Sequence, residues 1–269
     1  MADDESIARR PILRIEADTR SAVTDTVVVE EPLEIRVKGR GIAVTMRTPG
    51  HDLELAAGFL YSEGVIRRRA DVLAINHCQQ GDVENRGNIV NAYLSPRVEL
   101  DLDKLTRHVF ASSSCGLCGK ATIEAVQQCF PPLANARRFP ADILTRLPAA
   151  LQSQQTVFAQ TGGLHAAALF DAEGRLLDLR EDVGRHNAVD KLIGRGFLDD
   201  TLPFNERILL VSGRASFEIM QKSLAAGIPL VAAISAPSQL AVDFANRNGQ
   251  TLVGFLRDQR MNVYAGAVT

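Results

Sequence analysis

The sequence predicts an α/β protein, α+β overall, in which a small N-terminal α+β domain precedes a three-layer α/β domain. Apolar and polar side chains alternate with a period of two in the first half, and the pattern changes after Pro131-Pro132. Beyond that step, short strands that are apolar throughout alternate with helices, which is typical of a largely parallel or mixed sheet covered on both faces. We therefore expect a polar tail at 1–22, an N-terminal α+β domain at 23–110, a cysteine loop, helix and linker at 111–140, and the α/β domain at 141–269.

A hairpin, a helix and two further strands are expected in the first half. Residues 33–46 place apolar side chains at alternate positions on either side of a glycine-containing turn, which predicts a hairpin with one buried face. Asp52 is expected to cap a helix that ends near Gly64, because the apolar positions between them recur at helical spacing. Strand-like runs at 72–78 and 89–94 complete this unit.

The second half is a series of short apolar runs separated by helices and polar loops. A helix at 121–130 is stopped by two prolines, and the series begins after the linker. In the later helices, apolar residues such as Phe217, Met220 and Leu224 recur at helical spacing. Strands are expected at 165–170, 175–178, 208–211, 230–234 and 252–256, with helices near 187–194, 216–226 and 239–246.

Composition excludes several classes of protein. The chain has 269 residues, enough to bury a sizeable core, and its formal net charge of -2 argues against a dedicated nucleic-acid binder. No apolar run approaches the roughly 20 residues that span a bilayer, and the acidic N-terminus lacks the order of a signal peptide. We therefore expect a soluble, cytoplasmic protein with neither a nucleic-acid nor a membrane partner.

Two of the four cysteines, Cys115 and Cys118, are separated by two residues and precede a predicted helix. A cysteine reacts as its thiolate, and a free thiol with a pKa of about 8.5 is mostly protonated near neutral pH. The amides and dipole at a helix N-terminus, together with the cation of Lys120, favour the thiolate. The segment is therefore a candidate for nucleophilic sulfur chemistry.

Three other interpretations of the cysteine pair stay open on the residues alone. A structural zinc site needs four ligands, usually two such pairs, and Cys78 and Cys129 stand apart in the sequence. A thioredoxin-like redox motif belongs in a βαβ unit, whereas 101–110 has the pattern of a helix or loop. A pattern as short as CxxC also occurs without any role.

Three loops that follow predicted strands, 180–187, 212–216 and 235–238, carry residues suited to anions. Ligands of open α/β sheets bind beyond the carboxyl ends of strands, where helix N-termini present free amides. Ordinary helix capping explains any single loop, whereas the two dipeptides Gly184-Arg185 and Gly213-Arg214 together favour a phosphate-bearing ligand. His186 is interpreted as a cap or a hydrogen-bonding core residue in preference to a site residue.

The segment that leaves the last predicted strand is a further candidate. The aromatic ring of Phe255 with Arg257 and Arg260 suits a nucleobase and its phosphates, and Asp258 is able to accept hydrogen bonds from a guanine edge. A solvated turn at an edge strand explains the same residues.

Six segments spread over about 25–265 share the pattern of one known family, and Glu181–His186 is the most specific part. They are Gly58–Gly64, Cys115–Gly119, Thr161–Ala168, Glu181–Leu192, Ser212–Ser216 and Leu252–Phe255. Together they resemble the formate dehydrogenase accessory sulfurtransferases, often called FdhD.

The resemblance implies a sulfurtransferase that is required for formate dehydrogenase activity and forms a homodimer. Such a protein accepts persulfide sulfur from a cysteine desulfurase. It transfers this sulfur to the molybdenum cofactor, in its bis-molybdopterin guanine dinucleotide form, before the cofactor enters the catalytic subunit of formate dehydrogenase. By position, Cys115 matches the persulfide carrier and Cys118 its companion. The cofactor-binding segment matches Phe255, Leu256, Arg257, Asp258, Gln259 and Arg260.

The resemblance also implies that the second domain is similar to cytidine deaminases. A zinc deaminase uses His-x-Glu followed by Pro-Cys-x-x-Cys, with the glutamate shuttling protons. Here Ala167 stands where that glutamate belongs after His165, and Ser114 replaces the proline. We therefore predict no deamination and assign no metal ligand, while weak metal binding stays open. We call the transfer of persulfide sulfur through Cys115 the relay. Two alternatives to it stay open, a cofactor-binding chaperone without sulfur chemistry and a dithiol oxidoreductase.

Overall fold

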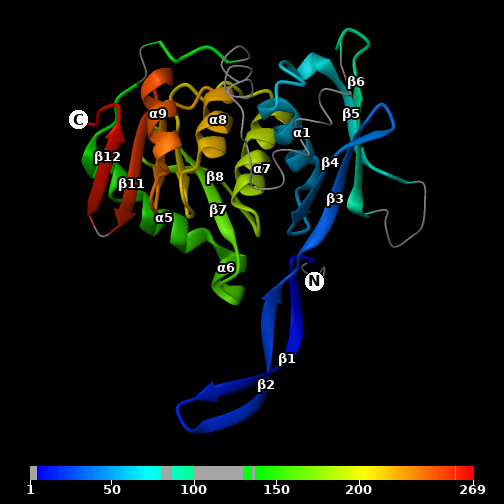
Figure 1. Cartoon of the computed structure of the whole chain (residues 1–269), viewed down its shortest axis with the longest axis vertical. Coiled ribbons are helices and arrows are strands. Elements are labelled where there is room, and N and C mark those ends of the chain that lie inside the picture. The colour runs from blue at the N-terminus through cyan, green and yellow to red at the C-terminus, as the bar shows by residue number, and fades with distance from the viewer. Residues whose placement is uncertain (1–4, 80–86, 100–129, 135–136, 258) are drawn as a thin grey trace.

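The computed structural model describes residues 5–79, 87–99, 130–134, 137–257 and 259–269. Within these residues two sheets and their helices form a body, from which the third sheet, a two-stranded hairpin, projects (Figure 1). The mixture of helices and sheets confirms the predicted α+β class.

The strands are β1 (Ile7–Glu16), β2 (Thr19–Val28), β3 (Glu31–Val37), β4 (Arg40–Arg47), β5 (Val72–His77), β6 (Ile89–Leu94), β7 (His165–Phe170), β8 (Leu176–Asp182), β9 (Ile208–Val211), β10 (Leu230–Ala233), β11 (Thr251–Arg257) and β12 (Arg260–Ala265). The helices are α1 (Asp52–Ser62), η1 (Arg69–Asp71), α4 (Ala141–Leu144), α5 (Leu147–Gln154), α6 (Thr156–Thr161), α7 (Arg185–Leu198), α8 (Phe217–Ala225) and α9 (Gln239–Asn248).

A six-stranded mixed sheet forms the second half, in the order β12-β11-β10-β9-β7-β8. β9, β10 and β11 are parallel, whereas β7 is antiparallel to β8 and β9, and β12 is antiparallel to β11. α7, α8 and α9 lie side by side against one face (Figure 1). α4 and α5 cover the other face, where Leu144, Leu147 and Leu151 share a core cluster with Phe170 and Leu210. The predicted mixed sheet with helices on both faces is confirmed, and its likeness to cytidine deaminases stays a prediction.

The first half forms the predicted small α+β unit. β4, β3, β6 and β5 make a four-stranded sheet in which β3 and β6 are parallel. Leu33, Ile35 and Val37 of β3 are buried at alternate positions, as the period of two predicts. The hydrophobic cluster that buries them continues through α1 into α7, α8 and α9, so the two halves share one core.

The prediction of a polar tail at 1–22 is wrong for residues 7–22. β1 and β2 pair antiparallel along their whole length and project from the body (Figure 1). Leu13 and Ile15 are 60% and 58% exposed, so no buried face imposes a regular apolar pattern on these strands. The sequence signal for a strand depends on such a face. The backbone hydrogen bonds that pair β1 with β2 do not require a particular pattern of side chains, so the sequence pattern did not predict this hairpin.

Smaller departures from prediction concern element ends and short helices. β8 extends to Asp182, beyond the strand predicted at 175–178, and α7 begins at Arg185 rather than near 187. α4, α5, α6 and β12 have no predicted counterpart, because short elements carry too few periods to be recognised. None of the described helices has both the length and the apolar character needed to cross a membrane.

Buried ion pairs also join the two halves. Arg180 of β8 donates to Glu54 of α1 through Nε at 2.6 Å and Nη2 at 3.0 Å. Lys222 of α8 donates to Asp190 of α7 at 2.8 Å and to Ser62, the last residue of α1, at 3.0 Å. Removing one partner of such a pair leaves an uncompensated buried charge, which costs roughly 3–5 kcal/mol.

We expect the protein to lose stability through Glu54 as the pH falls from about 4.5 towards 2. Burial raises the pKa of this carboxyl, but hydrogen bonds and charges from His51 and Arg180 outweigh it and lower the pKa from 4.5 to about 2. A lowered folded pKa stabilises the fold above the unfolded pKa, and this contribution disappears as the pH falls through the folded value. The difference in the free energy of unfolding between wild type and Glu54→Gln, measured with urea, should therefore be smaller near pH 3 than at neutral pH. A difference of equal size at both pH values would contradict the expectation.

Candidate functional site

Five strands meet at one edge of the six-stranded sheet. β8, β9, β10 and β11 end at this edge and β7 begins there, because β7 runs antiparallel to its neighbours. The loops after β8, β9 and β10 lead directly into α7, α8 and α9. Three helix N-termini therefore point at the edge, as in the ligand sites of open α/β sheets. We call it the strand-end site, formed by His165, 183–186, 212–216, 235–238, 255–257 and 259–260.

Backbone hydrogen bonds join the loops of the strand-end site into one surface. The Ser238 N–H donates to the Ala215 carbonyl at 3.0 Å, and the Phe255 N–H donates to the Ser235 carbonyl at 3.1 Å. The loops that follow β9 and β10 therefore lie next to the segment predicted to bind the cofactor.

His165 and Arg185 lie close together around Gly213. A Cβ on Gly213 would lie 3.2 Å from His165 Nδ1 and 3.7 Å from Arg185 Cβ, so the absence of a side chain lets the three segments approach. Burial, followed by the charges of Arg185 and His186, lowers the pKa of His165, which keeps its imidazole neutral near pH 7. The buried Nε of Arg185 has no hydrogen-bond partner within the described part of the chain, so it is available to donate to a ligand.

His186 forms a polar cluster with Ser216 and Glu218 at the start of α8. Its Nε2 lies 3.1 Å from Ser216 Oγ and 2.8 Å from Glu218 Oε2. The hydrogen bond from His186, with a smaller opposing effect of burial, lowers the pKa of Glu218. Ser216 is the N-cap of α8, yet its side chain does not cap the helix, whereas Ser238 does cap α9. His186 is therefore a partly exposed member of the strand-end site, which is the interpretation that the sequence ranked below a cap or a core residue.

The turn between β11 and β12 brings three predicted cofactor-binding residues together. Phe255 and Gln259 have positive φ values of 52° and 65°, and the pairing register shifts within this stretch. Phe255, Arg257 and Arg260 line a hollow of about 260 Å³ with Asn262. An aromatic side chain and two guanidinium groups around one hollow are suited to a nucleobase and its phosphates.

The other predicted residues of this segment lie differently. Leu256 is fully buried in the core cluster on the α4 and α5 face of the sheet, so its side chain does not reach the surface. Gln259 is exposed at the turn, and Asp258 lies outside the described residues.

The predicted reactive residues, Cys115 and Cys118, also lie outside the described residues. Residues 130–134 follow the cysteine segment and are the first described residues after it. They lie at the C-terminal end of α9, because the Leu133 N–H donates to the Asn248 carbonyl at 2.9 Å. α9 begins at the strand-end site and spans ten residues, about 15 Å. This flank of the cysteine segment therefore lies at the opposite end of α9 from the strand-end site.

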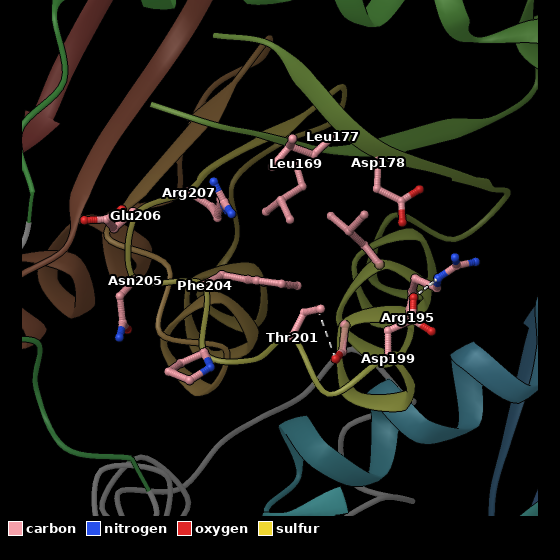
Figure 2. Close-up of a pocket in the computed structure, with 13 residues that line it drawn as sticks. Leu169, Leu177, Asp178, Arg195, Asp199, Thr201, Phe204, Asn205, Glu206 and Arg207 are labelled. Atoms are coloured by element: carbon pink, nitrogen blue, oxygen red, sulfur yellow. Dashed lines mark hydrogen bonds and ion pairs between the residues drawn. The ribbon is translucent and has the colours of Figure 1, made fainter. Parts of the chain in front are cut away.

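A second cavity, of about 550 Å³, lies at the C-terminal end of α7 (Figure 2). Leu169, Leu192 and Phe204 form its apolar part. Two of the charged residues that line it, Arg195 and Asp199, pair with each other, and none of the predicted site residues lines this cavity. The strand-end site is therefore the better candidate.

The sequence patterns missed the polar residues behind the strand-end site. Asp182, Asn187 and Lys191 are all buried, although Asp and Lys are seldom fully buried unless paired. Asn187, Lys191 and Gly194 recur at helical spacing on the face of α7 that meets α1, which is the signal that points to their burial. Among the described residues, no group of three or more His, Cys, Asp or Glu side chains is arranged to hold a metal ion.

Comparisons with known proteins agree with this architecture. A model described as the FdhD/NarQ family matches residues 28–268. The chain is 53% identical over 264 residues to the "Sulfur carrier protein FdhD" of Streptomyces coelicolor, covering 96% of this chain and 94% of that protein. It is 49% identical over 267 residues to the protein of the same name from Mycobacterium tuberculosis, covering 97% of each. A crystal structure from Desulfotalea psychrophila, provisionally named a formate dehydrogenase accessory protein, superposes with a TM-score of 0.75 at 27% identity and covers 97% of both chains.

Proposed function

The chain belongs to the FdhD/NarQ family, and we propose that it is a sulfur carrier that serves formate dehydrogenase. In this proposal Cys115 accepts persulfide sulfur from a cysteine desulfurase. It passes the sulfur to the molybdenum cofactor, as the bis-molybdopterin guanine dinucleotide, before the cofactor enters the catalytic subunit. The observation that carries the proposal is that relatives named sulfur carriers match 96–97% of this chain, and that the match to the family model, residues 28–268, spans the segment Cys115–Gly119.

The loading step is a thiol–persulfide exchange. The Cys115 thiolate attacks the terminal sulfur of the donor's persulfide, R–S–SH, and a new sulfur–sulfur bond forms as the old one breaks. The donor leaves as its thiolate, R–S⁻, and Cys115 carries the persulfide. No oxidant or reductant is consumed, because the transferred sulfur keeps its oxidation state.

The strand-end site supports the acceptor half of the proposal. The hollow beside Phe255 suits a guanine base and its phosphates. His165, next to the free Nε of Arg185, begins β7, three strands away from β11 in the sheet, or roughly 14 Å at the usual strand spacing. An extended dinucleotide is long enough to contact both groups.

Sulfur loading tests the proposal directly. The purified chain is treated with a cysteine desulfurase and cysteine, and its intact mass is measured before and after reduction. The proposal expects one or more added sulfur atoms that a reductant removes. Two results together would contradict sulfur transfer and favour a cofactor chaperone without sulfur chemistry. The wild-type chain would gain no mass, and a variant with Cys115 replaced would still support formate dehydrogenase activity.

We expect Arg260→Ala and Arg257→Ala each to weaken binding of GDP, a fragment of the cofactor, by about tenfold, since each removes a charge-assisted hydrogen bond to phosphate. Isothermal titration calorimetry measures the Kd. Arg247→Ala is the matched control, because Arg247 is an exposed arginine at the far end of α9. Equal weakening by the Arg247 change would show a general charge effect and contradict a site at the hollow.

A further inference from the structure

Asp182, the last residue of β8, is fully buried and surrounded by donors. Its carboxylate pairs with Lys191 Nζ at 2.7 Å. It also accepts hydrogen bonds from the Gly184 N–H at 2.7 Å, Asn187 Nδ2 at 2.9 Å and the Thr48 N–H at 3.2 Å. One carboxylate therefore binds the strand, the following loop, helix α7 and the first half of the chain.

The residues that contact Asp182 also form hydrogen bonds with the end of β4. Lys191 Nζ, whose side chain is 1% exposed, donates to the Thr48 carbonyl at 2.8 Å. Thr48 Oγ1 accepts from the Val183 N–H at 3.2 Å. Asn187 Nδ2 donates to the Met46 carbonyl at 2.7 Å, and Asn187 Oδ1 accepts from Thr45 Oγ1 at 3.1 Å. The residues at 45–48 are thus fastened to the loop and helix that follow β8.

These contacts determine where the loop after β8 lies. Only Val183 and Gly184 separate the end of β8 from the start of α7, and both N–H groups are bound within this network. A Cβ on Gly184 would lie 2.8 Å from Asn187 Nδ2, so the loop is closely packed against its partners. The next two residues, Arg185 and His186, belong to the strand-end site.

We propose that the Asp182–Lys191 pair, together with Thr48, is a positioning device through which the first half of the chain holds Arg185 and His186 in the strand-end site. The inference rests on the proposed function, since it takes Arg185 and His186 as contacts of the cofactor that the strand-end site receives. Supporting contacts of this kind typically change affinity about 10–100-fold when lost, without touching the ligand themselves.

A purely structural role for the pair is the alternative, and the chain contains a matched control for it. Arg180 lies on the same strand and, like Lys191, forms a buried pair with a carboxylate, that of Glu54, which joins the two halves. In the described part of the chain, Arg180 forms its hydrogen bonds and ion pairs with Glu54, Asp178 and Leu179, and none with the loop at 183–186. Arg180→Met and Lys191→Met both break a buried ion pair and keep a long unbranched side chain, but only the second disturbs the loop.

The test compares these two variants with wild type in three measurements. Calorimetry gives the Kd for GDP, thermal unfolding gives stability, and intact mass gives sulfur loading of Cys115 by the desulfurase. We expect Lys191→Met to raise the Kd about tenfold or more with sulfur loading retained. Arg180→Met should lower stability at least as much and change the Kd by less than about twofold. Unchanged GDP binding in Lys191→Met, or equal weakening in both variants, would overturn the inference.

A milder variant keeps the test decisive if Lys191→Met does not fold. Thr48→Val removes the hydroxyl that accepts from the Val183 N–H and keeps the shape of the side chain. We expect it to weaken GDP binding and to move the imidazole NMR signals of His186, with both unchanged in Arg180→Met. Identical His186 signals and GDP affinity in Thr48→Val and wild type would overturn the inference.

The outcomes separate this inference from the proposed function. Absence of sulfur loading in wild type contradicts the proposed function, whatever the Lys191 variant does. Loading without GDP binding in wild type contradicts the acceptor half and the positioning role together. Loading and binding in wild type, with no effect of either Lys191→Met or Thr48→Val, removes the positioning role alone.

Discussion

Replacing Cys115 with alanine is expected to abolish sulfur loading and to reduce formate dehydrogenase activity to background. Only a thiolate accepts sulfane sulfur from a persulfide, and alanine offers no nucleophile. The expected loss is complete, because no other group in the relay replaces the persulfide carrier. Intact mass after treatment with the desulfurase, and formate dehydrogenase activity in cells that depend on this chain, measure the two effects.

Cys118→Ala separates the relay from a dithiol oxidoreductase, since a Cys115–Cys118 disulfide requires both thiols equally. Under the relay, this variant still gains sulfur on Cys115. Cys129→Ala is the control, because it removes a cysteine outside the paired motif. If Cys118→Ala is as inactive as Cys115→Ala and neither gains mass, the relay is wrong and the disulfide mechanism is favoured.

The second large effect is expected at the crossing of α1 and α7. A Cβ on Gly194 would lie 1.8 Å from the Glu54 carbonyl oxygen, and one on Gly58 would lie 1.8 Å from the Asp190 carbonyl oxygen. Helix propensity alone predicts that Gly→Ala stabilises a helix by about 1 kcal/mol. The steric overlap is with backbone, which cannot rotate away, so the two helices have to separate within a shared core.

We therefore expect Gly194→Ala to lower the free energy of unfolding by roughly 3 kcal/mol. Urea unfolding measures the change. Gly87→Ala is the control, because Gly87 is exposed and a Cβ there meets no atom within 4 Å, so its change should stay within about 0.5 kcal/mol. If Gly194→Ala is as stable as wild type or more stable, the gain in helix propensity outweighs the steric overlap between α1 and α7. That result would contradict the close approach of the two helices.

Segments that match the family pattern contain residues of two different kinds. In 181–192, Arg185 and His186 reach the strand-end site, whereas Asp182, Asn187 and Lys191 are buried and bind the first half. In 58–64, Gly58 and Ser62 contact α7 and α8 and lie within the shared core. A matching motif therefore marks both a site and the contacts that hold it, and the sequence does not separate them.

Local structure is what the sequence by itself determined. The strands at 89–94, 165–170 and 208–211 have the predicted ends, because alternation and apolar runs depend on residues a few positions apart. The CxxC pair and the aromatic–arginine segment at 255–260 were also recognisable, since each is a short run of residues suited to one chemistry.

Only the tertiary structure decided what surrounds those residues. His165, Arg185 and Gly213 lie close together, and Phe255 lies at the same edge, because the sheet order brings the ends of their strands there. Sheet order depends on which strands pair, and no local pattern encodes that pairing. The burial of Asp182 depends likewise on Thr48, which is 134 positions away. A charge becomes buried only where the fold supplies its partners, so neighbouring residues alone did not reveal it.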